Sequence, residues 1–175
     1  SGITVNGAAE AALTVEEGSG AASFYVQSEE KPAVAANNNI LSSEVTPVEG
    51  AGTDCYLVEV VFAQGHSSEF SAQITAGDGS AEVSFSFGSF AFTVSSTLPV
   101  QGGGTAMLAG NAVRFYALPS VIAEGVTFRW ELEGDIADSV SMKDGGGMCT
   151  LTAQNTGTFT LRVTPVRGGF ALDVE

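Results

Sequence analysis

Apolar and polar residues alternate along residues 126–133, and this period of two is the feature that most constrains the fold. In an extended chain, successive side chains point to opposite sides. The apolar side chains that would share one side are Val126, Phe128, Trp130 and Leu132, and the polar ones between them are Thr127, Arg129, Glu131 and Glu133. Such a segment is typical of a strand with one face in a core and the other in water.

The same alternation recurs along residues 83–87, 158–164 and 170–174, whereas the evidence for helices is thin. The alanine-rich segment Ala8–Ala12 has a helical composition. It is shorter than the roughly 12 residues that an isolated helix needs. We therefore predict an all-β chain.

A glycine-rich turn separates two of these alternating segments. Gly77-Asp78-Gly79 lies between residues 70–74 and residues 83–87. Glycine supplies the positive φ that tight hairpin turns require. We predict that the two segments form a β-hairpin.

The phase of the alternation changes near residue 88. Phe85 and Phe87 share one phase, Phe90 and Phe92 share the other, and Gly88-Ser89 lies between the two pairs. A shift of one residue turns every following side chain to the opposite face of a sheet. The change is either a bulge within one strand or a chain that leaves one sheet and enters the next. We place a domain boundary near residues 88–95.

This boundary divides the chain into residues 1–90 and residues 91–175. Both lengths are close to the roughly 100 residues of a seven-stranded β-sandwich. The sequence thus predicts two tandem sandwiches.

The second half resembles an immunoglobulin-like (Ig-like) β-sandwich. Strands B, C and E of that fold would be residues 113–117, 126–133 and 148–153. Residues 155–161, Asn-Thr-Gly-Thr-Phe-Thr-Leu, resemble the start of strand F in the family, Asp-x-Gly-x-Tyr-x-Cys. The resemblance implies a sandwich over most of residues 92–175.

Two departures from this pattern indicate which Ig-like domains are the nearest comparison. Phe159 stands in place of the tyrosine, so the usual corner hydrogen bond cannot form. Leu161 stands in place of the cysteine, so aliphatic packing replaces the disulfide between strands B and F. This half therefore resembles the disulfide-free Ig-like and PKD-like modules of bacterial surface proteins.

The first half resembles bacterial Ig-like domains over two shorter segments. Residues 28–35 resemble a proline-containing strand of those domains, and residues 52–60 resemble a strand that follows a glycine-containing turn. The side chains that would share the core face of the second segment and its continuation are Tyr56, Val58, Val60 and Phe62. The opposite face, with Cys55, Leu57 and Val61, is expected to be covered as well.

Trp130 is the single tryptophan, and two interpretations of it are open. It could be a core residue packed across the sandwich on Phe159 or Leu161, or a platform on which a sugar ring stacks. The alternation places Trp130 with Phe128 and Leu132, and large aromatic side chains dominate cores. The pattern favours the core.

Residues that could carry catalysis do not form a recognisable constellation. His66 is the single histidine and lies in a loop beside serines and a glutamate, but neighbours along a loop do not make a triad. We predict a solvated loop histidine. Glu131 and Glu133 are typical of a solvated strand face rather than of a glycosidase pair. We predict no catalytic residue, no enzymatic activity and no cofactor.

Metal-binding patterns are also lacking in the sequence. Cys55 and Cys149 are the two cysteines, and we predict two free thiols, with Cys149 pointing inward and unreactive. Asp135, Asp138 and Asp144 could supply a few oxygens to a calcium ion, but the spacing of a calcium loop is missing. We predict no metal site.

The charge balance excludes several partners. Twenty acidic and six basic side chains give a formal net charge of −14. Such a chain lacks the cations that nucleic-acid binding needs, and it is repelled by anionic lipid surfaces. No apolar stretch approaches the roughly 18 residues of a spanning helix, so we predict no membrane insertion.

These expectations favour a non-catalytic spacer or adhesion module of a bacterial cell-surface or secreted protein. We expect it at the cell surface or outside the cell, with any signal peptide removed, as a monomer whose partner, a protein or a glycan, the sequence does not identify. The alternative is a carbohydrate-binding module appended to a secreted enzyme, which requires exposed aromatic side chains in a row. The candidates for that row are Phe24, Tyr25 and Tyr116.

Overall fold

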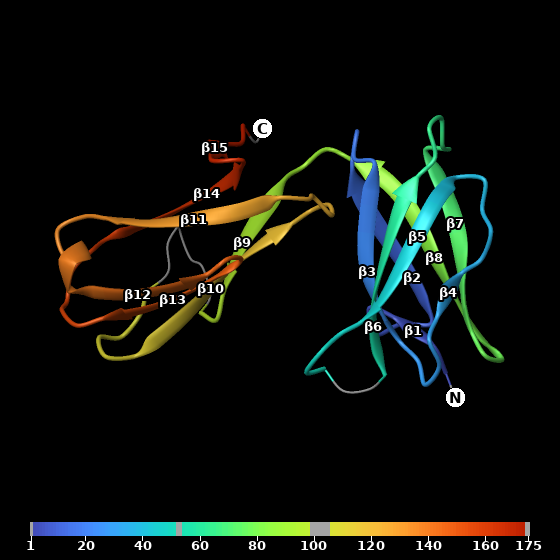
Figure 1. Ribbon diagram of the computed structural model, residues 1–175. Helices are drawn as coiled ribbons and strands as arrows, with labels where there is room; N and C mark the ends of the chain where they lie inside the picture. Colours follow the sequence, from blue (N-terminus) through green and yellow to red (C-terminus); the bar gives the residue numbers. More distant parts are fainter. Residues whose placement is uncertain (1, 52–53, 99–105, 174–175) are drawn as a thin grey trace. The chain divides into compact units, whose positions relative to one another are not determined.

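The computed structural model in Figure 1 describes residues 2–51, 54–98 and 106–173. Over these residues the chain forms strands and one short 3₁₀ helix, η1 (Ala137–Ser139), which confirms the all-β prediction. None of the helical residues described forms a segment long and apolar enough to cross a bilayer. Gly52, Thr53 and Val174, which the sequence patterns included, lie outside the described residues.

The chain divides into two units. The first contains Ser1–Phe90 and Val121–Glu124, and the second contains Ala91–Ser120 and Gly125–Glu175. The sequence pattern predicted a single boundary and did not predict that Val121–Glu124 would join the first unit.

The first unit consists of two sheets that face each other across a core (Figure 1). One sheet has the order β1-β3-β6-β5, and the other has the order β2-β8-β7-β4. Their strands are β1 (Thr4–Val5), β2 (Glu10–Glu16), β3 (Ala21–Gln27), β4 (Ala33–Val34), β5 (Ile40–Pro47), β6 (Cys55–Phe62), β7 (Glu69–Ala76) and β8 (Gly79–Gly88). The predicted hairpin is confirmed, because β7 and β8 pair antiparallel from Glu69↔Ser86 to Ala76↔Gly79.

The core of the first unit follows the alternation of its strands. In β6 the side chains of Val58, Val60 and Phe62 are buried, as predicted, and Tyr56 is half-buried. The opposite face is covered only in part: Cys55 and Leu57 are half-buried, whereas Val61 is 41% exposed. Apolar residues that face both sides of a strand can therefore belong to a sheet with one partly open face.

Strand β2 lies where the sequence showed only an alanine-rich segment. It runs parallel to β8, with register from Glu10↔Glu82 to Glu16↔Gly88. On its other edge Ile122 donates its N–H to the carbonyl of Thr14 at 2.7 Å, and Glu16 donates its N–H to the carbonyl of Ile122 at 3.0 Å. These bonds place Val121–Glu124 in the first unit.

The second unit is also a two-sheet sandwich (Figure 1). Its sheets have the orders β12-β13-β10-β9 and β11-β14-β15. Their strands are β9 (Phe92–Ser96), β10 (Ala112–Pro119), β11 (Val126–Glu133), β12 (Val140–Gly145), β13 (Met148–Ala153), β14 (Thr160–Arg167) and β15 (Phe170–Ala171). In chain order these are strands A to G of an Ig-like sandwich, with A-B-E-D in one sheet and C-F-G in the other.

The two most regular alternating segments lie side by side in one sheet, and this corrects an expectation. Strand β11 pairs with β14, so that Trp130 lies opposite Val163 and Leu132 opposite Leu161. Trp130 therefore does not pack on Leu161 from an opposing layer. The opposing layer is the sheet that contains Leu151 and Cys149. Alternation reveals which side of a strand is apolar, but it does not reveal which strands share a sheet.

Trp130 is a core residue, as the alternation predicted. Its side chain is 4% exposed, and its indole Nε1–H donates to the carbonyl of Gly146 at 2.8 Å. At the end of the chain the pattern was less informative. Strand β15 has two residues, and Phe170 is 79% exposed rather than buried.

Candidate functional site

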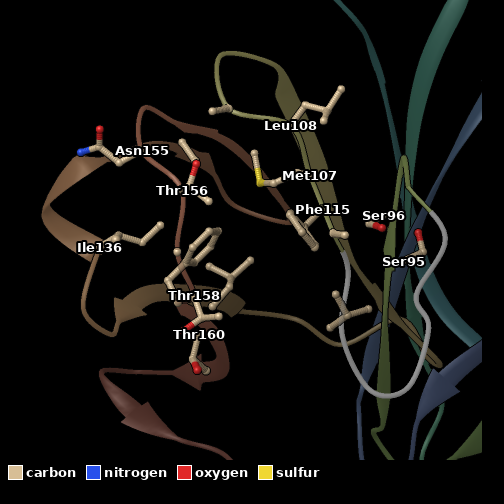
Figure 2. Close-up of a pocket in the computed structure, with 17 residues that line it drawn as sticks. Ser95, Ser96, Met107, Leu108, Phe115, Ile136, Asn155, Thr156, Thr158 and Thr160 are labelled. Atoms are coloured by element: carbon tan, nitrogen blue, oxygen red, sulfur yellow. The ribbon is translucent and has the colours of Figure 1, made fainter.

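A groove of about 770 Å³ opens in the second unit and is lined by residues from both of its sheets. Figure 2 shows the loop before β14 on one side of the groove and the segment before β10 on the other. The labelled side chains that line it are Ser95, Ser96, Met107, Leu108, Phe115, Ile136, Asn155, Thr156, Thr158 and Thr160.

A glycine allows the loop before β14 to pass close to its neighbour. Gly157 has a φ of +156°, and a Cβ added there would lie 2.7 Å from Cγ2 of Ile136. This glycine occupies the Gly position of the strand-F pattern, so close backbone approach explains why the pattern needs it here. Both Ile136 and Gly157 line the groove.

The lining of the groove is partly apolar and partly hydroxyl-bearing. Met107, Phe115 and Leu161 supply apolar surface, and Ser95 and Thr158 supply hydroxyls. No titratable side chain is among its described lining residues. Such a surface can hold a neutral ligand, but its side chains cannot transfer a proton as a general acid or base near neutral pH. The sequence did not reveal this groove, because its residues come from segments far apart in the chain.

His66 is not the solvated loop residue that we predicted. Its ring is half-buried and stacks on Phe87 with the ring centroids 4.6 Å apart, and Phe62 lies 5.3 Å away. The Nδ1 atom lies 2.9 Å from the backbone carbonyl oxygen of Ser67. The histidine therefore extends the aromatic core of the first unit and is oriented by a backbone carbonyl rather than by a carboxylate.

Glu131 and Glu133 lie on a solvated strand face, as predicted. Arg162 donates a hydrogen bond from Nη2 to Oε2 of Glu133 at 3.1 Å, and both side chains are more than half exposed. This hydrogen bond and the charge of Glu133 raise the pKa of Arg162. Arg129 lies 3.7 Å from Glu131. Exposed pairs of this kind contribute little to stability.

The predicted row of exposed aromatic side chains does not form. Phe24 is buried in the core of the first unit, so its candidacy was wrong. Tyr25 is 52% exposed and belongs to the first unit, whereas the half-buried Tyr116 belongs to the second. Adjacent residues in a strand point to opposite faces, which explains why Phe24 and Tyr25 differ.

Two of the aspartates that were weighed as calcium ligands lie in the connection between β11 and β12, and the third lies in β12. Asp135 follows β11, Asp138 lies in η1 and Asp144 lies in β12. Among the described residues, no three histidine, cysteine, aspartate or glutamate side chains form a group that could hold a metal ion.

Both cysteines are free thiols, and Cys149 is fully buried. Burial, and secondly the carboxylate of Asp144, raises the pKa of the Cys149 thiol from 9.0 to about 11. Because the thiolate is the reactive form, the folded chain protects Cys149 from alkylation near neutral pH.

The raised pKa of Cys149 predicts a loss of stability in alkali. Between pH 9.0 and about 11 the unfolded chain releases this proton and the folded chain retains it. The contribution of this thiol to the free energy of unfolding is therefore complete below pH 9.0 and falls by on the order of 2 kcal/mol as the pH approaches 11. Urea unfolding followed by Trp130 fluorescence measures the fall. Cys149→Ala should show a smaller decrease in the free energy of unfolding over this pH range. An equal decrease in the variant and the wild type would contradict the prediction.

Comparisons with known proteins place this chain in no family, because no protein-family model and no curated protein matches it. Similar solved structures include domains 4-9 of the surface layer protein SbsC, at 16% identity and TM-score 0.40 over 98% of this chain and 30% of that one. The D00-D0 domain of intimin matches at 11% identity and TM-score 0.35 over 97% of this chain and 95% of its own. The I9-I11 tandem from titin matches at 8% identity and TM-score 0.30 over 92% and 94%.

The chain thus spans 30% of the SbsC structure and nearly the whole of the other two. At these TM-scores the likeness adds nothing to what the strand order already shows. That order gives the fold directly: an all-β chain of two tandem Ig-like β-sandwiches.

Proposed function

We propose that this chain is a non-catalytic spacer and interaction module of an extracytoplasmic bacterial protein, at the cell surface or secreted. A spacer must hold its shape while its ends are pulled apart. The observation that supports this role is the parallel pairing of β2 with β8 in the first unit.

Parallel pairing of the first and last long strands of a unit determines how it responds to force. When the ends of residues 1–90 are pulled apart, β2 and β8 slide along each other, so the ladder from Glu10↔Glu82 to Glu16↔Gly88 is loaded as a whole. An antiparallel pair joined at a turn opens one bond at a time instead. A sandwich closed in this way resists extension better than one that unzips.

The bonds of this ladder can be assigned to alternate residues of β2. Glu17 donates its N–H to Gly88, and Glu82 donates its N–H to the carbonyl of Ala9. In a parallel ladder every second residue bonds to the same neighbour. Residues of odd number in β2, Ala11 among them, therefore bond to β8, and the N–H of Ala12 points away from it.

Ala11→Pro should therefore lower the unfolding force of the first unit, because proline removes one donor from the loaded ladder and distorts the strand. Ala12→Pro is the matched control, since it places the same residue one position along without removing a donor to β8. Single-molecule extension of the chain between its termini measures both variants. If Ala11→Pro lowers the unfolding force no more than Ala12→Pro does, the proposal that the β2–β8 ladder resists extension is overturned.

The location is tested separately. Cells that make the full-length protein should expose this module to added protease while they remain intact. Protection of the module until the cells are lysed would contradict a surface position.

A further inference from the structure

One exposed sheet face in the first unit combines negative charge with apolar side chains. We call the outward side of the β1-β3-β6-β5 sheet the acidic face. Its outward side chains include Tyr25, Glu44, Leu57, Glu59 and Val61. None of its four strands contains lysine or arginine.

The two glutamates of the acidic face lie directly opposite each other. Glu44 in β5 is the register partner of Glu59 in β6, and both are exposed. No salt bridge involves either of them over residues 2–51, 54–98 and 106–173. Like charges at opposed positions destabilise a strand pair. A cation brought over this pair would relieve that repulsion.

The surroundings of the pair are acidic as well. The first unit carries thirteen acidic side chains and one lysine, a formal charge of −12. The second unit carries seven acidic and five basic side chains, a formal charge of −2. Nearly all of the net charge therefore belongs to the unit with the acidic face.

The second unit has a sheet face of the opposite character. We call the outward side of the β12-β13-β10-β9 sheet the basic face. Arg114 and Lys143 are exposed and lie in one row on either side of Thr150. Asp144 is the only acid in these four strands, and it lies in the other phase of β12, opposite the buried Cys149.

The basic face also bears exposed apolar side chains. Leu118 is 49% exposed, Met148 is 39% exposed, and Tyr116 is half-buried between them in the register of the sheet. Across the strands, the basic face therefore has the two cations at one register position and apolar or aromatic side chains at the next outward position.

Along a strand, the order of side chains on the two faces is complementary. Along β6 the outward residues Leu57, Glu59 and Val61 give the order apolar, acid, apolar. Along β10 the outward residues Ala112, Arg114 and Tyr116 give the order apolar, cation, aromatic. Both sets repeat at about 7 Å, the distance between alternate residues of a strand. A cation of one face can therefore lie over the acids of the other while the apolar residues on either side meet.

We propose that the acidic face of one copy of this chain binds the basic face of a second copy. The interface is heterologous, because two different surfaces meet, so each bound copy leaves one face of each kind open for another. This proposal names a partner for the interaction part of the proposed function and does not depend on the mechanical role of β2 and β8.

The association is weak and increases with concentration, because each copy carries a net charge of −14. In dilute solution the chain is then the monomer expected from its sequence. Added salt screens the repulsion between whole molecules as well as the attraction between the faces. The salt dependence of association therefore does not test the proposal, whereas exchange of the charges on the two faces does.

The experiment uses two charge-exchanged chains and analytical ultracentrifugation from micromolar to millimolar concentration. E44K/E59K makes both faces of a chain basic, and R114E/K143E makes both faces acidic. We expect the average mass of the wild-type chain to rise with concentration. Each variant alone should associate about tenfold more weakly or not at all, and an equal mixture of the two should regain the wild-type behaviour.

Global charge effects are separated by a matched control. E44K/E59K reduces the net charge from −14 to −10, which by itself would favour association. E10K/E69K has the same net charge but changes exposed residues of the other sheet, and it should associate at least as well as the wild type. Far-ultraviolet circular dichroism and Trp130 fluorescence verify that every variant is folded.

Three results would overturn the proposal. The first is a wild-type chain that stays monomeric at millimolar concentration. The second is a mixture of the exchanged variants that associates no better than either alone. The third is an E10K/E69K chain that loses association as fully as E44K/E59K. None of these results bears on the unfolding force of Ala11→Pro, so failure here is distinguishable from failure of the spacer role.

Discussion

Trp130→Ala is expected to lower the free energy of unfolding of the second unit by about 3–5 kcal/mol. The indole is 4% exposed and packs in a cluster with Ala117, Cys149 and Leu151 from the opposing sheet. Truncation leaves a cavity in that cluster. It also leaves the carbonyl of Gly146 without its donor, because the indole Nε1–H binds it at 2.8 Å.

Urea unfolding followed by circular dichroism measures this loss. Trp130→Phe is the control, because it keeps much of the apolar volume and removes the hydrogen bond to Gly146, so its cost should be smaller, about 1–3 kcal/mol. The fluorescence of the wild-type chain supplies an independent check, since Trp130 is its single tryptophan. An emission maximum typical of an indole in water would contradict the buried position.

Phe85→Ala should destabilise the first unit by about 3–5 kcal/mol as well. The ring of Phe85 is 2% exposed and lies between three other phenylalanines. Its centroid is 5.2 Å from that of Phe70, 5.5 Å from that of Phe62 and 6.2 Å from that of Phe24. These rings come from both sheets, so the variant removes part of the contact between the two layers.

Calorimetric unfolding of the full chain measures the effect of Phe85→Ala. Phe87→Ala is the matched control, two positions along the same strand and on the same side of it. Phe87 is half-buried and contacts His66 and Phe62 at the rim of the cluster, so its loss should cost less. Equal costs for the two variants would contradict the placement of Phe85 at the centre of this core.

The alternation of the sequence was sufficient to predict β6, β7, β8, β11 and β14 and most of their core side chains. Trp130, Val58 and Val60 are buried. In a regular strand, residues two apart share a face, so an apolar residue at every second position forms one apolar face that packs in the core. The hairpin of β7 and β8 was equally accessible, because its turn residues lie between its two strands.

What the sequence did not predict depends on contacts between distant segments. The assignment of 126–133 and 158–164 to one sheet requires knowledge of strand order, which alternation does not carry. The parallel position of β2 and the bonds of Ile122 were missed for the same reason. The candidate groove and the stacking of His66 on Phe87 likewise appear only when separate loops and strands are brought together.

The partner of β2 has a consequence for how the protein is made. Strand β2 emerges from the ribosome early, but its neighbour β8 ends at Gly88, and Ile122 on its other edge follows later still. Until those residues have been synthesised, the nascent chain presents both edges of β2 to any other extended polypeptide nearby. Pairings between distant segments also form slowly. Strand β2 is therefore strongly exposed to mispairing during translation. Any protein that binds the nascent chain over β2 would protect it.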